Sequence, residues 1–259
     1  MTTHSTLARR ELARFPWGIS ARGLRAGRAT TERIDPLSAV AARPVTGGIL
    51  ALAVVLPVLT LLSRGSEVTW LAGFVLATVL VIATAAIILD RTRAHRSVFS
   101  VAWGLLIYLV LGAVLALAVA STYGANLLLR DDWAPLVAGL ILLSLAPYRP
   151  ALELATATAS LTAVSALLAL LQAPFAASPV PLATFAVAGS SSLACLGFAS
   201  AAYAFSVNGS ILTWLEQAWR SAAATAVEQR GGVARSVQQQ RVSLVNRKVV
   251  PFFTRIGAA

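Results

Sequence analysis

Few ionisable residues lie inside the apolar segments of this chain, and each is a candidate for chemistry because a charge is costly to keep within a membrane. Glu153 follows Arg149 by four residues, a spacing that places an acid and a base one turn apart on a helix. A carboxylate there could bind a proton or a cationic substrate, but we interpret the two residues as a structural ion pair at the membrane interface. Asp90, beside Arg91 and Arg93, is interpreted as a solvated residue at the boundary of another segment.

The imidazole and thiol groups form no catalytic or metal-binding pattern. Histidine occurs only as His4 and His95, neither of which has a nucleophile and a carboxylate nearby, and Cys195 is the single cysteine. The pair Gly231–Gly232 lacks the flanking residues of a phosphate-binding loop. We therefore predict that the chain is not an enzyme and has no catalytic, cofactor-binding or metal site.

Two groups of small and hydroxyl residues are expected to serve helix packing. Ser190, Ser191 and Ser192 lie between Gly189 and Gly197, and small side chains let helices in a bilayer approach closely. The hydroxyl residues of segment 152–171 occur at alternate positions, so we expect them to face different sides and not to form one polar stripe. These residues are Thr156, Thr158, Ser160 and Thr162.

The composition identifies the class of protein that contains these residues. Of 259 residues, 58% are hydrophobic and 12% are charged, whereas a soluble globular domain has about 25% charged residues. The net charge is +11, but the charges cluster at the ends of apolar segments and no basic patch is interleaved with aromatic residues. Membrane topology explains this placement better than nucleic-acid binding does. The excess of arginine over lysine, with much alanine and leucine, is typical of a GC-rich bacterial gene.

Six apolar segments follow a polar N-terminal tail, residues 1–44, that contains eight arginines. A membrane-spanning helix needs about 20 apolar residues, and the fourth segment, with 16, is the shortest. The sequence therefore predicts an all-α, polytopic membrane helical bundle of about six transmembrane helices over residues 45–207, with Pro57 kinking the first. The segments are Val45–Leu62, Val68–Leu89, Val98–Ser121, Trp133–Tyr148, Leu152–Leu171 and Pro179–Val207.

The positive charges are distributed asymmetrically across this stack. With six spans, 19 of the 21 Lys and Arg residues lie on one side and two on the other. Because positively charged loops stay in the cytoplasm, we predict a multi-pass protein of the inner (plasma) membrane with both termini cytoplasmic. Four spans plus a re-entrant hairpin, formed by the fourth and fifth segments, would preserve the same parity. The outer loops are short, so any stimulus or substrate must be met within the bilayer or at its rim.

The two ends of the chain are expected to be cytoplasmic. A basic amphipathic helix over Leu7–Phe15, with Phe15 and Trp17 at the membrane surface, is one interpretation of the tail, and a disordered tail is the other. Residues 208–259 are predicted to form juxtamembrane helices after a hinge at Asn208–Ser210. The helices would cover 211–229 and 233–256, with an interruption at Gly231–Gly232 and a bend at Pro251.

Apolar residues near heptad spacing in this C-terminal region are consistent with a two-helix packing seam. We expect a homodimer that forms through these helices, and we expect no nucleic-acid partner. The seam residues are Ile211, Leu215, Ala218, Ala222 and Thr225, followed by Val233, Val237, Gln240 and Leu244.

The stretch Gln240–Ile256 has the residue types of a degenerate dimerisation helix. With the basic tail, the close-packed spans and the juxtamembrane helix, it resembles the membrane-sensor half of bacterial two-component sensor histidine kinases. In one class of these kinases a phosphoacceptor histidine precedes a proline by five residues. Asn246 stands at that distance before Pro251 in this chain.

In the other class an Arg-Ile-Ala-Arg-Glu-Leu-His-Asp pattern leads the helix. Aligning Arg241–Val242 with its start places Arg247 at the histidine and Lys248 at the aspartate. Because no histidine follows His95, the resemblance implies a sensor-like protein that lacks the phosphoacceptor and the ATP-binding domain. Such a chain would be either the front half of a longer kinase-like protein or a stand-alone remnant.

These observations favour a non-catalytic, sensor-like input module that couples the membrane bundle to its C-terminal helices and to a cytoplasmic signalling partner. The alternative is a small transporter or channel subunit, although the sequence contains no internal repeat and few polar residues at mid-bilayer depth. A membrane-embedded enzyme would need a catalytic constellation that the residues do not form. A scaffold without a ligand is a further alternative.

Overall fold

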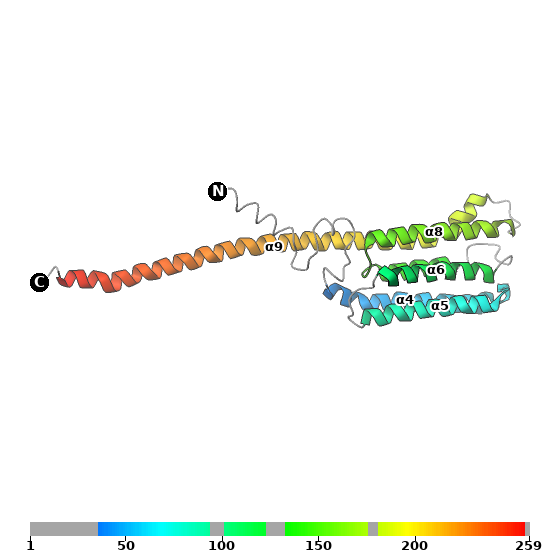
Figure 1. Ribbon diagram of the computed structural model, residues 1–259, viewed down its shortest axis with the longest axis horizontal. Coiled ribbons are helices and arrows are strands. Elements are labelled where there is room, and N and C mark those ends of the chain that lie inside the picture. The colour runs from blue at the N-terminus through cyan, green and yellow to red at the C-terminus, as the bar shows by residue number, and fades with distance from the viewer. Residues whose placement is uncertain (1–35, 94–100, 123–132, 176–180, 257–259) are drawn as a thin grey trace. The chain divides into compact units, whose positions relative to one another are not determined.

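The computed structural model describes residues 36–93, 101–122, 133–175 and 181–256, and every regular element in these ranges is a helix (Figure 1). The predicted all-α class is thereby confirmed. The proposed surface helix Leu7–Phe15 and both histidines lie outside the described residues.

Six apolar helices correspond one to one to the six predicted segments. They are α4 (Pro36–Arg64), α5 (Leu71–Arg93), α6 (Val101–Ser121), α7 (Trp133–Leu145), α8 (Ala151–Gln172) and α9 (Leu182–Ile256), with short 3-10 helices η1 (Gly65–Glu67) and η3 (Ala173–Phe175). Five of them contain a stretch that is long and apolar enough to cross a membrane: Ala41–Ser63, Leu71–Thr92, Ala102–Ser121, Ala151–Gln172 and Leu182–Ala223. The chain is thus a helical bundle of the multi-pass membrane class.

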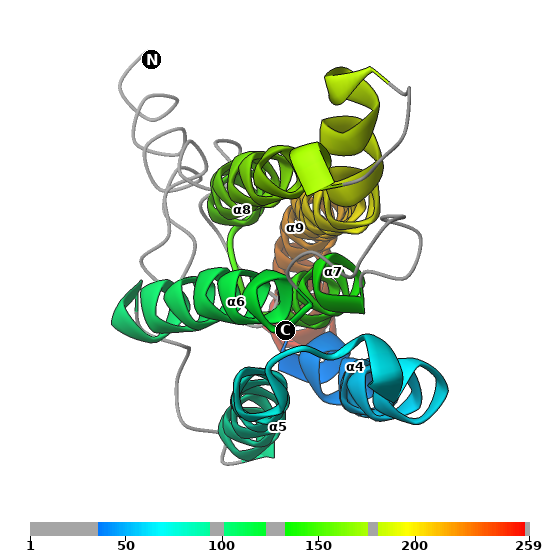
Figure 2. The same cartoon turned by 90° about the vertical axis from the view of Figure 1, so that its right-hand side faces the viewer.

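Helix α7 is the exception in length. Its 13 residues extend about 20 Å, less than the roughly 30 Å of a bilayer core. All of its side chains except Leu136 and Leu143 are buried, and it lies among α4, α6 and the yellow part of α9 (Figure 2). The aromatic ring of Trp133, its first residue, packs against that of Phe74 at a centroid distance of 5.5 Å. The weakest predicted span is therefore an internal helix that is enclosed by the longer ones.

The direction of α6 and α8 shows how the chain returns between them. Tyr108, near the start of α6, bonds Glu153 near the start of α8. Gln172, the last residue of α8, bonds the carbonyl of Val119 near the end of α6. The two helices are therefore parallel, with both ends of α8 level with the ends of α6, and the chain between them must run back through α7. Because α8 is as long as a membrane-spanning helix, the alternative in which the fourth and fifth segments form a re-entrant hairpin is disfavoured.

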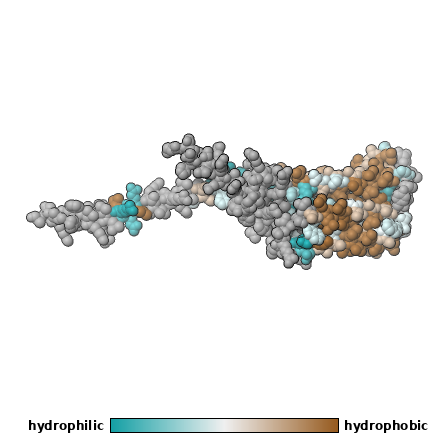
Figure 3. Space-filling model, in the orientation of Figure 1, coloured by the Kyte–Doolittle hydropathy of each residue, from teal (hydrophilic) through white to brown (hydrophobic). Residues whose placement is uncertain are grey.

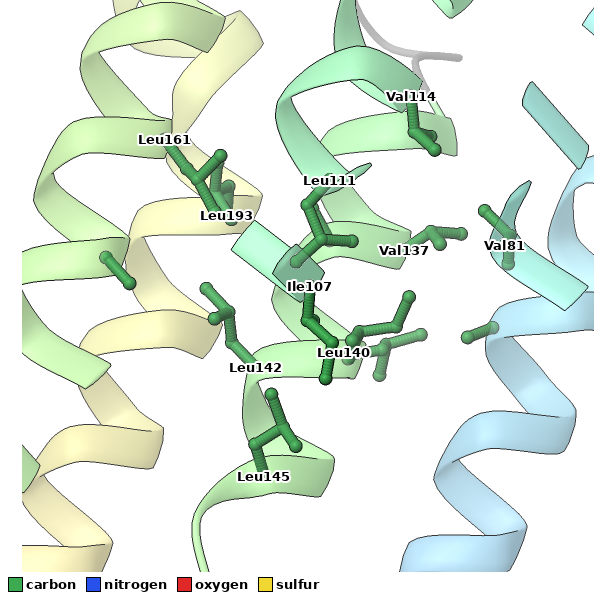
Figure 4. Packing of buried hydrophobic residues seen from close by; sticks show 14 of the residues in the cluster. Val81, Ile107, Leu111, Val114, Val137, Leu140, Leu142, Leu145, Leu161 and Leu193 are labelled. Atoms are coloured by element: carbon green, nitrogen blue, oxygen red, sulfur yellow. The ribbon is translucent and has the colours of Figure 1, made fainter. Parts of the chain in front are cut away.

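Aliphatic side chains from several helices fill the centre of the bundle (Figure 4). Val81 of α5, Leu111 of α6 and Val137 of α7 have no solvent-exposed surface. The face of the bundle seen in Figure 3 is also largely brown, and exposed side chains of the bundle include Leu62 and Leu109. An apolar surface over an apolar core fits a helix bundle surrounded by lipid, where acyl chains replace water.

Helix α9 contributes to two compact units, Met1–Ile211 and Leu212–Ala259. Its helical hydrogen bonding continues through Asn208–Ser210 and through Gly231–Gly232, so the predicted interruption at Gly231–Gly232 is wrong. The helix does not break at Asn208–Ser210, although the two units divide just after this predicted hinge, at Ile211. A glycine inside a helix costs only about 1 kcal/mol relative to alanine, and the flanking residues are mostly good helix formers. The helices that contain Pro57 and Pro251 likewise continue past them.

Candidate functional site: a charged cluster in the bundle

The predicted ion pair between Arg149 and Glu153 is confirmed, and its arginine is buried within the bundle. Arg149 lies in the turn between α7 and α8 and is only 2% exposed. Its Nε donates to Oε1 of Glu153 at 2.9 Å, and its Nη2 contacts the same oxygen. Because Glu153 opens α8 one turn later, the pair fixes the turn to the start of that helix.

Helix α6 completes this Glu153 cluster, which consists of Gly104, Tyr108, Arg149 and Glu153. The Tyr108 hydroxyl donates to Oε1 of Glu153 at 3.1 Å. A Cβ atom at Gly104 would lie 2.7 Å from the same oxygen and would also overlap Nη2 of Arg149. Only a glycine at this position lets the guanidinium lie directly against the backbone of α6.

The geometry determines what the Glu153 cluster can do. One carboxylate oxygen accepts hydrogen bonds from both a guanidinium and a phenol, and the acid and base neutralise each other. A buried guanidinium requires such a partner because an uncompensated charge in a bundle is costly. The cluster is thus suited to joining α6, the α7–α8 turn and α8 at one end of the bundle. The Glu153 side chain, 25% exposed, is the part of the cluster that faces outward.

We expect Tyr108→Phe to lower the free energy of unfolding by about 1.5 kcal/mol, because the substitution removes a hydrogen bond to a charged group and keeps the ring. Dodecyl sulfate titration of the protein in mixed micelles, followed by circular dichroism, measures this change. Tyr203 lies in α9 outside the cluster and is 55% exposed, so Tyr203→Phe serves as the matched control for removal of a phenol hydroxyl. An unchanged unfolding midpoint for Tyr108→Phe would show that the phenol contributes nothing to the cluster.

A second cationic contact lies at the same end, where α5 ends and α6 and α8 begin; we refer to it as the arginine-rich end. The guanidinium carbon of Arg91 lies 4.3 Å from the ring centroid of Trp103, a cation–π contact between α5 and α6. This contact and the Glu153 cluster involve adjacent residues of α6, Trp103 and Gly104. The sequence placed Arg91 at the segment boundary but contained no sign of its aromatic partner.

Small residues bring α8 and α9 close together, as predicted. The Ser165 hydroxyl donates to the carbonyl of Gly189 at 2.7 Å. A Cβ atom at Gly197 would lie 2.5 Å from both Cγ2 and Oγ1 of Thr158, so these backbones approach more closely than side chains would allow. The hydroxyls of Ser190 and Ser191 bond carbonyls one turn back in their own helix. The interhelical contacts confirm a packing role for Gly189 and Gly197, whereas the packing role of the three serines stays a prediction.

The hydroxyl residues of α8 face different sides, but three of them share a face that the sequence analysis overlooked. Thr156 and Ser160 are exposed, whereas Thr158 is buried against α9. Thr158, Thr162 and Ser165 are spaced by four and three residues, so they form a stripe on one face of the helix. Thr158 and Thr162 already share this face of the helix, and Ser165, which lies outside the alternating set 156–162, extends it.

Polar contacts at the opposite end of the bundle involve the last carbonyls of α6. The carbonyl of Ser121 accepts hydrogen bonds from the backbone nitrogens of Thr69 and Trp70, at 2.9 and 3.1 Å, and from the Thr69 hydroxyl at 3.0 Å. The side-chain amide of Gln172 donates to Val119 at 3.3 Å. These bonds satisfy carbonyls that a helix end leaves without partners, so this group serves the fold.

Within the described ranges no three His, Cys, Asp or Glu side chains are grouped so that they could hold a metal ion. Cys195 is exposed on α9. The Glu153 cluster is therefore the principal polar constellation of the described bundle. The chain matches no protein-family model, no curated protein and no solved structure.

Proposed function

We propose that this chain is a sensor-like input module of a bacterial plasma membrane, with both termini cytoplasmic, in which α9 couples the bundle to a C-terminal dimerisation helix. The observation that carries the proposal is that α9 is one uninterrupted helix from Leu182 to Ile256. The charge asymmetry, 19 basic residues against two, supports the orientation.

The bundle part of α9 is in close contact with its neighbours. Gly197 meets Thr158 of α8, and a Cβ at Gly139 of α7 would lie 2.9 Å from Cβ of Leu196. Close contacts of this kind resist small displacements, because packed interfaces change between discrete arrangements and do not deform continuously. A stimulus that altered the packing of α7 or α8 would therefore act on α9.

The described side chains of the second unit are largely exposed, including large apolar ones. Trp214 is 65% exposed, Trp219 48%, Val237 43% and Val242 56%. An isolated helix with exposed tryptophans and valines requires a partner or a membrane surface to cover them. The heptad spacing of Ile211, Leu215 and their successors favours a second copy of the same helix.

Cysteine crosslinking in membranes tests this proposal. Cys195 is replaced by alanine, and single cysteines are introduced at each position from 211 to 225. We expect strong dimer formation at Leu215, Ala218 and Ala222 and weak formation at Gln217 and Arg220, because only the first group lies on the heptad seam.

Two controls make the crosslinking result specific. Coexpression with an excess of the cysteine-free chain should dilute the crosslinked dimer, as expected for association of two identical subunits. Cysteines on the lipid-facing side of α5, such as Val79→Cys, should crosslink weakly, because two such cysteines can meet only when two chains collide at random in the membrane. Uniform crosslinking, or none, along 211–225 contradicts a helical dimer seam and with it the proposed output.

The transporter alternative receives less support from the geometry. Thr158 and Ser165, which are buried on α8, use their hydroxyl protons in bonds to main-chain carbonyls, so these two hydroxyls cannot also donate to a substrate. Flux of ions or small solutes into proteoliposomes is the measurement that separates the two functions.

A further inference from the structure

Among the residues that the structure describes, Arg91 contacts the Trp103 ring and no carboxylate pairs with it. The Arg149 guanidinium at the same end, by contrast, is neutralised by Glu153. A cation on an aromatic face gains only part of the stabilisation that an oxyanion would supply. Arg91 is therefore a candidate for binding an anion from outside the chain.

Stacking on Trp103 prepares Arg91 for such an anion. A guanidinium is planar and directs its N–H donors outward from its edge, so a ring on one face leaves those donors free to bond. The ring also restricts the orientation of the side chain, which reduces the entropy lost when a ligand binds. A fixed fork of N–H donors matches two oxygens of one phosphate group.

The depth of Arg91 in the bilayer indicates which phosphate it would meet. Along α5, about 30 Å separates Leu71 from Arg91, which is the thickness of a bilayer hydrocarbon core. Trp103 lies two residues after the start of α6, and tryptophan is enriched at the level of lipid headgroups. Arg91 is partly exposed, so a molecule in the surrounding bilayer can reach it.

The charge on this side of the stack favours a negatively charged lipid. The predicted topology assigns to it 19 basic residues and seven acidic ones, whereas two basic and three acidic residues lie on the other side. Basic residues near a membrane surface attract anionic phospholipids, each contributing about 1 kcal/mol. A zwitterionic headgroup offers the same phosphate, but its own ammonium neutralises it.

From these observations we infer that Arg91 and Trp103 form a binding site for the phosphate of an anionic phospholipid, at the arginine-rich end between α5 and α6. The indole orients the guanidinium, and the guanidinium donates to two phosphate oxygens. This site is separate from the dimerisation seam, so each proposal can fail without the other.

The test uses the full chain, purified in maltoside micelles, with phosphatidylglycerol as the probe. The lipid is titrated, and its mole fraction at half-maximal thermal stabilisation is measured alongside a titration with phosphatidylcholine. We expect the wild-type chain to prefer phosphatidylglycerol and Arg91→Gln to require about fivefold more of it. Arg91→Lys retains the positive charge but lacks the planar N–H donors of a guanidinium. The mole fraction of phosphatidylglycerol that it requires should therefore lie between those of the wild-type chain and Arg91→Gln.

Two further variants separate this site from a general electrostatic effect. Arg220→Gln removes a cation that is 75% exposed, paired with Glu216 and located in the second unit, and it should leave the titration unchanged. Trp103→Leu retains the cation and removes its aromatic support, and should weaken binding about threefold. Wild-type affinity in Arg91→Gln, or an equal response to both lipids, overturns the proposal. Protection by inorganic phosphate at the same concentration would assign the site to a soluble anion and also overturn it.

Discussion

Glu153→Ala is expected to lower the free energy of unfolding by about 3 kcal/mol, a large effect for one side chain. The substitution leaves Arg149, which is 2% exposed, without the carboxylate that neutralises it. An arginine remains protonated, so the turn between α7 and α8 must either hold an uncompensated charge or move. The partial exposure of Glu153 keeps the loss at the lower end of the range for buried pairs. Dodecyl sulfate titration in mixed micelles measures it.

Two companion variants separate charge from packing in the Glu153 cluster. Glu153→Gln keeps the size of the side chain and an acceptor oxygen, so its free energy of unfolding should fall by about half as much as that of Glu153→Ala. The double variant Arg149→Met with Glu153→Leu removes both charges, and should recover most of the stability because apolar replacements of a buried pair are often neutral. If Glu153→Ala unfolds at the wild-type midpoint, the pair does not stabilise the bundle.

The apolar helices could be predicted from the sequence because lipid imposes a simple requirement on length and composition. Helices α5, α6 and α8 begin and end within a few residues of the predicted segments, because charged or proline-containing stretches bound each apolar run. Helix α7 is three residues shorter than its predicted segment, and its internal position could not be foreseen. A helix buried by other helices and one surrounded by lipid have the same apolar composition, so hydropathy does not distinguish them.

The polar site was only half predictable. Arg149 and Glu153 are four residues apart, so local helical geometry identified them as a pair. Gly104 and Tyr108 belong to a helix 45 residues earlier, and no periodicity marks the face of α6 that meets α8. Their i, i+4 spacing was a weak signal that gains meaning only when the partner helix is known. The contact of Arg91 with Trp103 could not be predicted either, because it joins two helices whose facing sides are not marked in the sequence.

Helix α9 does not break at the predicted hinge, for a thermodynamic reason. Asn208, Gly209 and Ser210 each have weak helix propensity, but a short run of weak helix formers costs less than breaking the hydrogen bonds of a helix that continues on both sides. Asn208 is buried, at 3% exposure, so tertiary contacts also stabilise the helix there. Local sequence signals for breaks carry less weight in long helices than in short ones.

Gly197→Ala is expected to lower the free energy of unfolding by about 2 kcal/mol and to change the crosslinking pattern of the second unit. The new methyl group would lie 2.5 Å from Cγ2 and Oγ1 of Thr158, so α8 and α9 must separate or shift along each other. If α9 transmits changes in the bundle, the dimer yield at Leu215, Ala218 and Ala222 should shift with it. Mixed-micelle unfolding and the crosslinking assay measure the two effects on the same protein.

Gly48→Ala is the matched control, because a Cβ atom at Gly48 of α4 meets nothing within 4 Å. That variant should be unchanged or more stable by up to about 1 kcal/mol, since alanine is the better helix former. Thr158→Ala, combined with Gly197→Ala, removes the two atoms that the new methyl group would meet at 2.5 Å, although Cβ of residue 158 remains at 3.0 Å, and should restore part of the stability and the original crosslinking pattern. A loss of stability with no change in crosslinking would show that the α8–α9 contact serves the fold alone, and would separate the bundle from the proposed dimerisation helix.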